Sequence, residues 1–389
     1  MLNFRAAVRP VLKHPGFTLV AVLTIAIGIG ANAALFSVYD QLVLNPVDVP
    51  NPATLVALTT RNPNGNGNVP NVSVPRYREI KATAKSFASV GITAFDNFTL
   101  TGHGEPQALN GQRIDPTFLP TLGVMPAIGR NFTEAEDAPN GPLVCILSHE
   151  VWATQFGGRE TIVGETFSLD GRSYEVVGIM PPHLTPPFQQ VHVFVPRVFE
   201  AGGLTTQQVE LGSLYAQAIG RLAPGVSLSQ ARDELQAVAA GYKEHFGANL
   251  DANYPAEVQT FVDSLVGAIQ PTFLTLLGAV GFVLLIACAN VASLFLGRLT
   301  ARHKEIALRQ SLGAGRPQIV MQFLTESVIF TAVAGGLGLL LAVWALWAMQ
   351  STLASQLPPN TTLTLNGRAV MFTVLVTAIS ALVVPPRIT

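Results

Sequence analysis

The sequence predicts an α-helical integral membrane protein that carries one large α+β domain outside the membrane. Three long stretches contain no charged residue, namely Phe17–Tyr39, Pro271–Leu296 and Ser327–Thr364. A polar segment from about residue 40 to residue 268 separates the first two. Hydrophobic residues make up 49% of the chain and charged residues only 12%, whereas soluble domains contain about 25% charged residues. The chain therefore has the composition of a membrane protein, and its charges gather in the extramembrane segments.

Helix geometry decides which apolar stretches can cross a bilayer. At a rise of 1.5 Å per residue, the apolar core Phe17–Val38 is about 33 Å long, which is enough for the hydrocarbon layer. Phe273–Leu296 and Val328–Met349 are long enough by the same test. A fourth apolar stretch, Ala369–Val384, is shorter and runs directly into two prolines. We therefore expect three spans and a truncated or marginal fourth.

The N-terminus has two interpretations. Arg5, Arg9 and Lys13 precede the first apolar run, and Ala31-Asn32-Ala33 has the A-x-A pattern of a signal-peptide cleavage site. The apolar region of a secretory signal is about 7–15 residues long, but here apolar residues continue beyond this pattern. We favour a retained membrane anchor and keep the signal peptide as the alternative.

Positive residues set the expected orientation, because they favour the cytoplasmic side of the membrane. The segment before the first span is cationic, and the loop between the second and third spans carries five basic residues: Arg298, Arg302, Lys304, Arg309 and Arg316. Both segments should be cytoplasmic. The large polar segment and the short loop after the third span should then lie outside.

The outer segment contains both strand and helix patterns. A helix is expected at Val74–Phe87, with a proline near its start. Asp170-Gly171 predicts a hairpin turn, and Ser227 with Gln230 matches a capping box. The apolar face of the following helix comprises Leu228, Ala231, Leu235, Val238 and Ala239. Strand-like runs lie at Ser89–Ala94, Phe98–Thr101, Gln107–Ile114, Leu143–Leu147, Thr166–Leu169, Ser173–Ile179, Tyr215–Leu222 and Glu257–Val262. These patterns predict an α+β domain made of two subdomains, one inserted into the other.

Motifs for catalysis or cofactor binding are missing from the sequence. The phosphate-loop pattern G-x-x-x-x-G-K-(S/T) does not occur, so the chain cannot bind ATP in that manner. Gly28-Ile29-Gly30 and Gly335-Gly336-Leu337-Gly338 lie within apolar spans, where close helix packing is the expected role. His183 and His192 have no nearby cysteine, so we expect no metal site. The net charge is −1, whereas domains that bind nucleic acid usually carry a net positive charge. We expect no catalytic residue, no directly bound cofactor and no nucleic-acid partner.

Two polar residues, Asn290 and Ser293, lie inside the second apolar stretch. Polar groups are costly in lipid and often functional. We favour an interhelical hydrogen bond at Asn290 over the alternative of a substrate pathway.

The most specific stretch follows these two residues along the chain. It reads Arg302-His303-Lys304-Glu305-Ile306-Ala307-Leu308-Arg309-Gln310-Ser311-Leu312-Gly313-Ala314. This closely resembles the segment R-x-x-E-I-x-(L/I/V)-R-x-(A/S)-L-G-A of the permeases of the MacB/FtsX class of ABC transporters. Leu122–Arg130 and Val176–Pro181 resemble the periplasmic core domain of the same class. The opening residues His14–Thr18 look most like the first half of its long duplicated members, whereas the end of the chain departs from the usual fourth helix.

The resemblance implies a layout and a set of partners. The expected order is a cytoplasmic segment (1–16), a span (17–38), a MacB-like periplasmic core domain (39–270), a span (271–296), a cytoplasmic loop with a coupling helix (297–326), a span (327–349), an outer loop (350–368) and an incomplete fourth span (369–389). The protein should lie in the bacterial inner membrane. A cytoplasmic ABC ATPase, a second copy or second permease half, and the lipid bilayer are its implied partners, and the class also allows a periplasmic adaptor.

The resemblance also implies a mechanism. ATP would act only through the separate ATPase, and its closure would move the outer domain, so that a cargo is exported by mechanotransmission. The implied coupling residues are Arg302, Lys304, Glu305, Ile306, Ala307, Leu308, Arg309, Leu312, Gly313 and Ala314. The alternatives are an FtsX-like scaffold that regulates a cell-envelope enzyme, and a true membrane enzyme.

Overall fold

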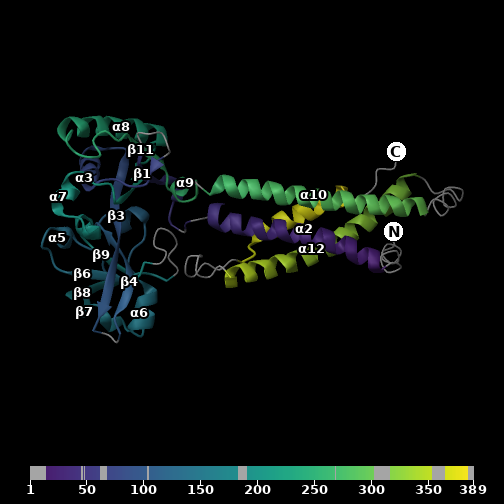
Figure 1. The fold of residues 1–389 in the computed structure, drawn as a ribbon, viewed down its shortest axis with the longest axis horizontal. Helices are drawn as coiled ribbons and strands as arrows, with labels where there is room; N and C mark the ends of the chain where they lie inside the picture. Colours follow the sequence, from purple (N-terminus) through teal and green to yellow (C-terminus); the bar gives the residue numbers. More distant parts are fainter. Residues whose placement is uncertain are drawn as a thin grey trace. The chain divides into compact units, whose positions relative to one another are not determined.

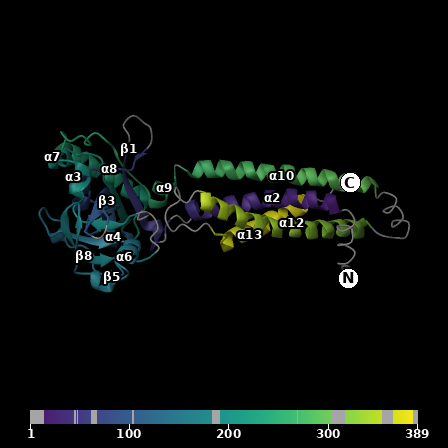
Figure 2. The same ribbon diagram turned by 60° about the horizontal axis from the view of Figure 1, so that its bottom comes forward.

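A computed structural model describes residues 15–44, 47, 49–61, 68–102, 105–182, 191–267, 269–301, 316–352 and 364–383. The chain divides into two compact units. One comprises Met1–Asn45 with Ala268–Thr389, and the other comprises Pro46–Gly267. Figures 1 and 2 show the helices of the first unit and the sheet of the second.

The first unit consists of apolar helices. They are α2 (Pro15–Tyr39), α10 (Gln270–Ala301), α12 (Arg316–Thr352) and α13 (Gly367–Val383), and a π-helical turn, η1 (Asp40–Leu44), follows α2. Three helices of the described chain contain a segment long and apolar enough to span a membrane: Thr18–Leu44, Gln270–Ser293 and Ser327–Thr352. In α13 the apolar part, Gly367–Ala381, is shorter than these. The fourth helix is thus present, whereas its status as a span stays a prediction.

Glycines allow α2 to pack closely against its neighbours. A Cβ on Gly30 would lie 2.8 Å from the carbonyl oxygen of Gly338 in α12. A Cβ on Gly28 would lie 2.7 Å from Cδ1 of Leu284 in α10. Both distances are too short for a real Cβ. Position 30 needs glycine, because the atom it meets is a backbone carbonyl oxygen, whereas a Cβ at position 28 would require the Leu284 side chain to move. The expected packing role is confirmed for the three glycines at these two contacts, Gly28, Gly30 and Gly338.

The second unit is built on a mixed sheet. Within the described residues, eleven strands pair in the order β11-β1-β10-β3-β4-β9-β6-β8-β5, with β2 beside β1 and β7 beside β3 and β8. The strands are β1 (Leu55–Arg61), β2 (Asn68–Val69), β3 (Phe87–Thr101), β4 (Gln107–Ile114), β5 (Ile128–Gly129), β6 (Val144–Leu147), β7 (Thr166–Leu169), β8 (Arg172–Ile179), β9 (Val193–Val195), β10 (Gln217–Leu222) and β11 (Ala256–Thr260). Two pairs, β4 with β9 and β6 with β8, are parallel, and the others are antiparallel.

Short helices connect these strands. They are η2 (Pro52–Thr54), α3 (Val74–Thr83), α4 (Phe118–Leu122), α5 (Glu134–Asp137), α6 (His149–Gln155), η3 (Glu160–Ile162), η4 (Val198–Gly203), α7 (Thr206–Glu210), α8 (Leu228–His245) and α9 (Phe261–Val266). The long strand β3 pairs with β10 through its first half and with β4 along its second half. The sheet is therefore continuous across both expected subdomains. Helix α8 packs on β11 and α3 at one end of the sheet, as Figure 1 shows.

Several local predictions are confirmed. Strands β4 and β7 have the expected bounds. Asp170 and Gly171 both have positive φ, 49° and 75°, as a two-residue turn of type I′ requires. Ser227 and Gln230 form the predicted capping box at the start of α8.

Other predicted helix and strand boundaries were wrong, because tertiary contacts determine where these elements end. The helix expected at Val74–Phe87 ends at Thr83, because the Glu234 carboxylate accepts hydrogen bonds from the backbone N–H groups of Lys85 and Ser86 at 2.9 and 2.7 Å. These contacts fix an extended chain that continues into β3. The two strands expected at Ser89–Ala94 and Phe98–Thr101 are one strand, β3.

The strand expected at Glu257–Val262 also has a different end. It stops at Thr260, because the Thr260 hydroxyl accepts from the N–H of Asp263 at 3.0 Å and caps the short helix α9.

Candidate functional site

The predicted coupling residues all lie outside the described residues. They are Arg302, Lys304, Glu305, Ile306, Ala307, Leu308, Arg309, Leu312, Gly313 and Ala314. Helix α10 is described to Ala301, and α12 is described from Arg316. The coupling role of this segment therefore stays a prediction from the sequence.

The two predicted intramembrane polar residues lie on an exposed side of α10. The Ser293 hydroxyl donates to the carbonyl oxygen of Ala289 in its own helix at 2.9 Å. Asn290 is exposed, and the structure gives its amide no hydrogen-bond partner among the described residues. The interhelical hydrogen bond expected at Asn290 is thus not formed within the described chain.

A different asparagine, Asn32, joins two helices. Its side chain is 4% exposed, and its Nδ2 donates to the carbonyl oxygens of Gly28 at 2.9 Å and Val280 at 3.2 Å. The second contact links α2 to α10. From the sequence, Asn32 was noted only as the centre of an A-x-A pattern. The signal that could have predicted its interhelical hydrogen bond is a single amide inside an apolar span.

A polar cluster joins the end of α2 to the start of α13. The Asp40 carboxylate, 2% exposed, accepts from the Asn366 amide and pairs with Arg368 Nη1 at 3.4 Å. The Gln41 amide donates to the carbonyl oxygen of Thr364 at 2.5 Å. A cavity of about 570 Å³ is lined in part by these residues. Asp40 begins the π-helical turn η1, and such turns are frequent at functional sites.

The Asp40 cluster gives a prediction about stability. Asp40→Ala should lower the free energy of unfolding by about 1–3 kcal/mol, because it removes the acceptor of a part-buried amide. Arg368→Ala is the matched control and should cost about 0–1 kcal/mol, because the arginine side chain is 61% exposed. Thermal unfolding of the two purified variants in detergent measures both. Equal losses would contradict this account and assign the stabilisation to the ion pair.

A fully buried ion pair lies in the second unit, Pro46–Gly267. Arg76 Nε lies 3.3 Å from Asp251 Oδ2, and the two side chains are 2% and 0% exposed. The Tyr242 hydroxyl donates to Asp251 Oδ1 at 3.0 Å, and its ring lies under the guanidinium at 5.2 Å. The Ser73 hydroxyl donates to the second carboxylate oxygen at 2.5 Å. Burial lowers the pKa of Arg76, and the charge of Asp251 opposes this shift. This cluster ties α3 to α8 and to the segment before β11.

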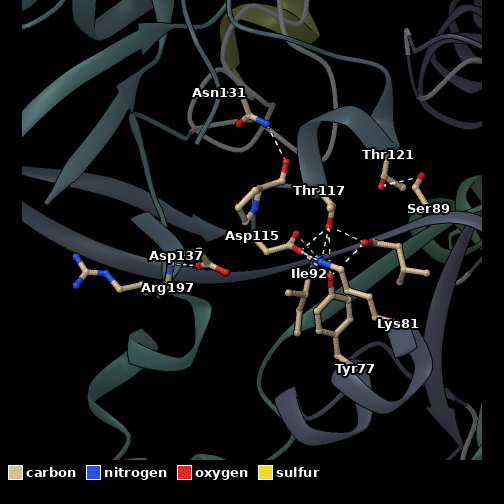
Figure 3. Close-up of polar contacts among 12 residues, drawn as sticks. Tyr77, Lys81, Ser89, Ile92, Asp115, Thr117, Thr121, Asn131, Asp137 and Arg197 are labelled. Carbon is tan, nitrogen blue, oxygen red and sulfur yellow. Dashed lines mark hydrogen bonds and ion pairs between the residues drawn. The ribbon is translucent and has the colours of Figure 1, made fainter. Parts of the chain in front are cut away.

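A second buried network centres on Asp115, after β4. Figure 3 shows side chains converging on its carboxylate: the Tyr77 hydroxyl donates at 2.6 Å, Lys81 Nζ lies at 2.9 Å, and Thr117 donates as well. The other carboxylate oxygen accepts from the N–H of Ile92 in β3 at 3.1 Å. Burial, reinforced by the charge of Asp115, raises the pKa of Tyr77. The network fixes α3 on the middle of the sheet.

Asp137 is a titratable group near this network. Its carboxylate accepts from the backbone N–H of Arg197 at 2.6 Å, a contact also drawn in Figure 3. Burial raises the pKa of Asp137 to about 6, and the bond from Arg197 opposes this shift.

The raised pKa of Asp137 predicts a pH dependence. The unfolded value is about 3.9, so the folded state binds more protons between about pH 4 and pH 6, and stability falls as the pH rises through this range. In Asp137→Asn the decrease in the free energy of unfolding should be smaller by about 1–2 kcal/mol, because asparagine does not titrate. The hydrogen bond from the Arg197 N–H is kept, because the amide oxygen can still accept it. Urea unfolding at pH 4.5 and pH 7 measures the difference. An identical fall in parent and variant would refute the assignment.

Other residues with chemically versatile side chains have structural roles where the structure describes them. The Ser148 hydroxyl accepts from the N–H of Val151 at 3.2 Å and caps α6. His192 Nδ1 accepts from the N–H of Asn110 at 3.1 Å. Cys145 is buried, which raises the pKa of its thiol and leaves it unreactive. His183 lies outside the described residues. Among the described residues, no group of three His, Cys, Asp or Glu side chains is arranged to hold a metal ion.

Two family models match this chain. The MacB-like periplasmic core domain matches residues 18–238, and the FtsX-like permease C-terminal domain matches residues 277–385. Together they cover α2, most of the second unit and most of the three later apolar helices.

Curated relatives give the same result. The macrolide export ATP-binding/permease protein MacB of Nitrosomonas europaea is 26% identical over 62% of this chain and 37% of its own length. MacB of Chlorobium luteolum is 28% identical over 66% of this chain and 40% of its own length. The uncharacterized ABC transporter permease YknZ of Bacillus subtilis is 23% identical over 87% of this chain and 84% of its own length. The chain thus spans about two fifths of the length of these MacB relatives.

Among solved structures, the periplasmic region of MacB from Actinobacillus actinomycetemcomitans aligns with a TM-score of 0.41 and 16% identity. The alignment covers 56% of this chain and 92% of that one.

Proposed function

Because this chain belongs to the MacB/FtsX-type permeases of ABC transporters, we propose that it converts ATP hydrolysis by a separate ATPase into movement of its extracytoplasmic domain. The observation that carries the proposal is the presence of both family domains in one chain, with the coupling-type sequence Arg302–Ala314 in the loop between its second and third spans. The sequence has no phosphate loop, so another polypeptide or segment must bind ATP.

Two structural observations support mechanotransmission over passage through the spans. Close glycine contacts hold α2 against α10 and α12. A cavity of about 400 Å³ between α2, α10 and α13 is lined almost entirely by apolar atoms, including those of Phe36, Leu277 and Val376. An apolar lining is unfavourable for a polar cargo. The cargo would therefore be handled by the extracytoplasmic domain.

The remaining parts of the proposal follow from the family. The protein would lie in the bacterial inner membrane, because a cytoplasmic ATPase and an outward-facing domain require a chain that crosses that membrane. ABC transporters use two ATPase sites at a paired permease, so we propose a homodimer or a pair with a second permease half. A periplasmic adaptor is a further proposed partner.

Co-purification tests the proposal. The tagged chain, extracted from its native membranes, should bring down a cytoplasmic ABC ATPase, and ATP hydrolysis should rise when the purified subunits are combined in nanodiscs. Binding without stimulated hydrolysis would favour the alternative of an FtsX-like scaffold. Recovery of no ATPase would refute the proposed function.

A further inference from the structure

We propose that the exposed face of α10 around Asn290 is the surface on which a second copy of this chain packs. The inference rests on the proposed function, because it names the contact that pairs two permeases. We call this surface the Asn290 face and define it by the exposed residues Thr275, Phe282, Ile286, Asn290 and Ser293. Their spacing of three, four or seven residues places them on one side of the helix.

The opposite side of α10 is already occupied. Leu284, Ala287 and Val291 are 7%, 7% and 1% exposed, and Leu284 and Val291 belong to a buried cluster with α2 and α12. On the Asn290 face, Phe282 and Ile286 are 69% and 60% exposed. In the most apolar 18-residue window of each helix, 17% of α10 is buried, against 56% of α2. Among the candidate spans of the described chain, α10 therefore has the most surface left to cover.

Asn290 makes this surface more than an ordinary lipid-facing stripe. It lies eight residues before Arg298, which is about 12 Å along the helix and places it within the apolar stretch. Its amide has two N–H donors and one carbonyl acceptor. In lipid such groups need a partner, since water is missing there.

The other polar groups of this face are satisfied within their own helix. The Ser293 hydroxyl donates to the carbonyl oxygen of Ala289 at 2.9 Å, and the Thr275 hydroxyl donates to that of Pro271 at 2.9 Å. Asn290 has no such bond in the part of the chain that the structure describes. A partner that covers this face must therefore supply both a donor and an acceptor at one position.

A second copy of this chain meets that requirement. A carboxamide is self-complementary, and a two-fold axis beside α10 would set the two Asn290 side chains opposite each other, each donating to the other's oxygen. The flanking Phe282 and Ile286 would then pack against the same apolar side chains of the other copy. A lipid acyl chain could cover these apolar groups but offers the amide nothing. The contact would also pair the two α10 helices directly before the predicted coupling segment.

Disulfide cross-linking in native membranes tests the surface. Ile286→Cys and Ser293→Cys should each give a cross-linked dimer under copper-phenanthroline oxidation, because paired faces bring Cα atoms within about 7 Å. Val333→Cys is the matched control: it is 53% exposed but lies on α12, and it should stay monomeric. The native Cys145 and Cys288 are buried and should not react. Cross-linking only at Val333, or at neither surface, would overturn the inference.

Substitution of the amide gives a second readout. Asn290→Leu should weaken dimerisation about tenfold in a membrane association assay, whereas Asn290→Gln should retain most of it. Unchanged dimerisation of Asn290→Leu would overturn the role of the amide, and cross-linking to a different permease chain would replace the second copy by that partner. If ATPase stimulation persists while the Asn290 face does not cross-link, only this inference fails. If the face cross-links but no ATPase binds, the proposed function fails instead.

Discussion

Leu308→Asp should abolish stimulation of the partner ATPase while the protein still inserts and folds. In the MacB/FtsX motif, Leu308 occupies the position reserved for an aliphatic residue. Helices that dock into a groove bind through a few buried apolar anchors, and an unpaired charge in such a contact costs several kcal/mol. We expect ATP hydrolysis in nanodiscs to fall to the level of the ATPase alone.

The control for this variant is Gln310→Asp, which adds the same charge at a variable position of the motif. It should retain most of the stimulation, because a solvated side chain contributes little to docking. Glu305→Lys should weaken binding, because it adds positive charge to an already cationic loop. If Leu308→Asp and Gln310→Asp both stimulate like the parent, the segment is a solvated basic turn and the coupling assignment is wrong.

Asp251→Ala should have the largest effect on the stability of the extracytoplasmic domain. The substitution leaves the Arg76 guanidinium, 2% exposed, without its carboxylate, and an uncompensated buried charge costs about 3–5 kcal/mol. Glu210→Ala is the control, because its ion pair with Arg78 is about half exposed on both sides and should contribute about 0–1 kcal/mol. Urea unfolding of the full chain in detergent gives both values. If the two variants lose similar amounts of unfolding free energy, the buried ion pair does not stabilise the domain more than the exposed pair does.

The sequence predicts features that depend on neighbours along the chain. The capping box of Ser227 with Gln230, the turn at Asp170-Gly171 and the three apolar spans all arise from local spacing. Each is found in the structure because a few adjacent side chains determine its geometry. The same holds for Gly30, whose place in an apolar stretch indicates helix packing.

Features that depend on distant partners were not predictable. Arg76 and Asp251 are 175 residues apart, and nothing in either local sequence shows that the two will meet. The early end of α3 depends on Glu234, 149 residues beyond Lys85. Asn290 shows the same limit for the candidate site. Its place in an apolar stretch predicts that it lies in a span, but only the packing of α10 shows that its side chain is exposed.

A distance measurement tests the central claim of ATP-driven movement most directly. Lys243, exposed on α8, can be changed to cysteine and spin-labelled, since both native cysteines are buried. In a paired complex with its ATPase, double electron–electron resonance then measures the distance between the two spin labels, one on each extracytoplasmic domain. Mechanotransmission predicts that this distance distribution shifts between the nucleotide-free and ATP-bound states, and that Leu308→Asp removes the shift. A distribution that stays unchanged while ATP is hydrolysed would contradict the account.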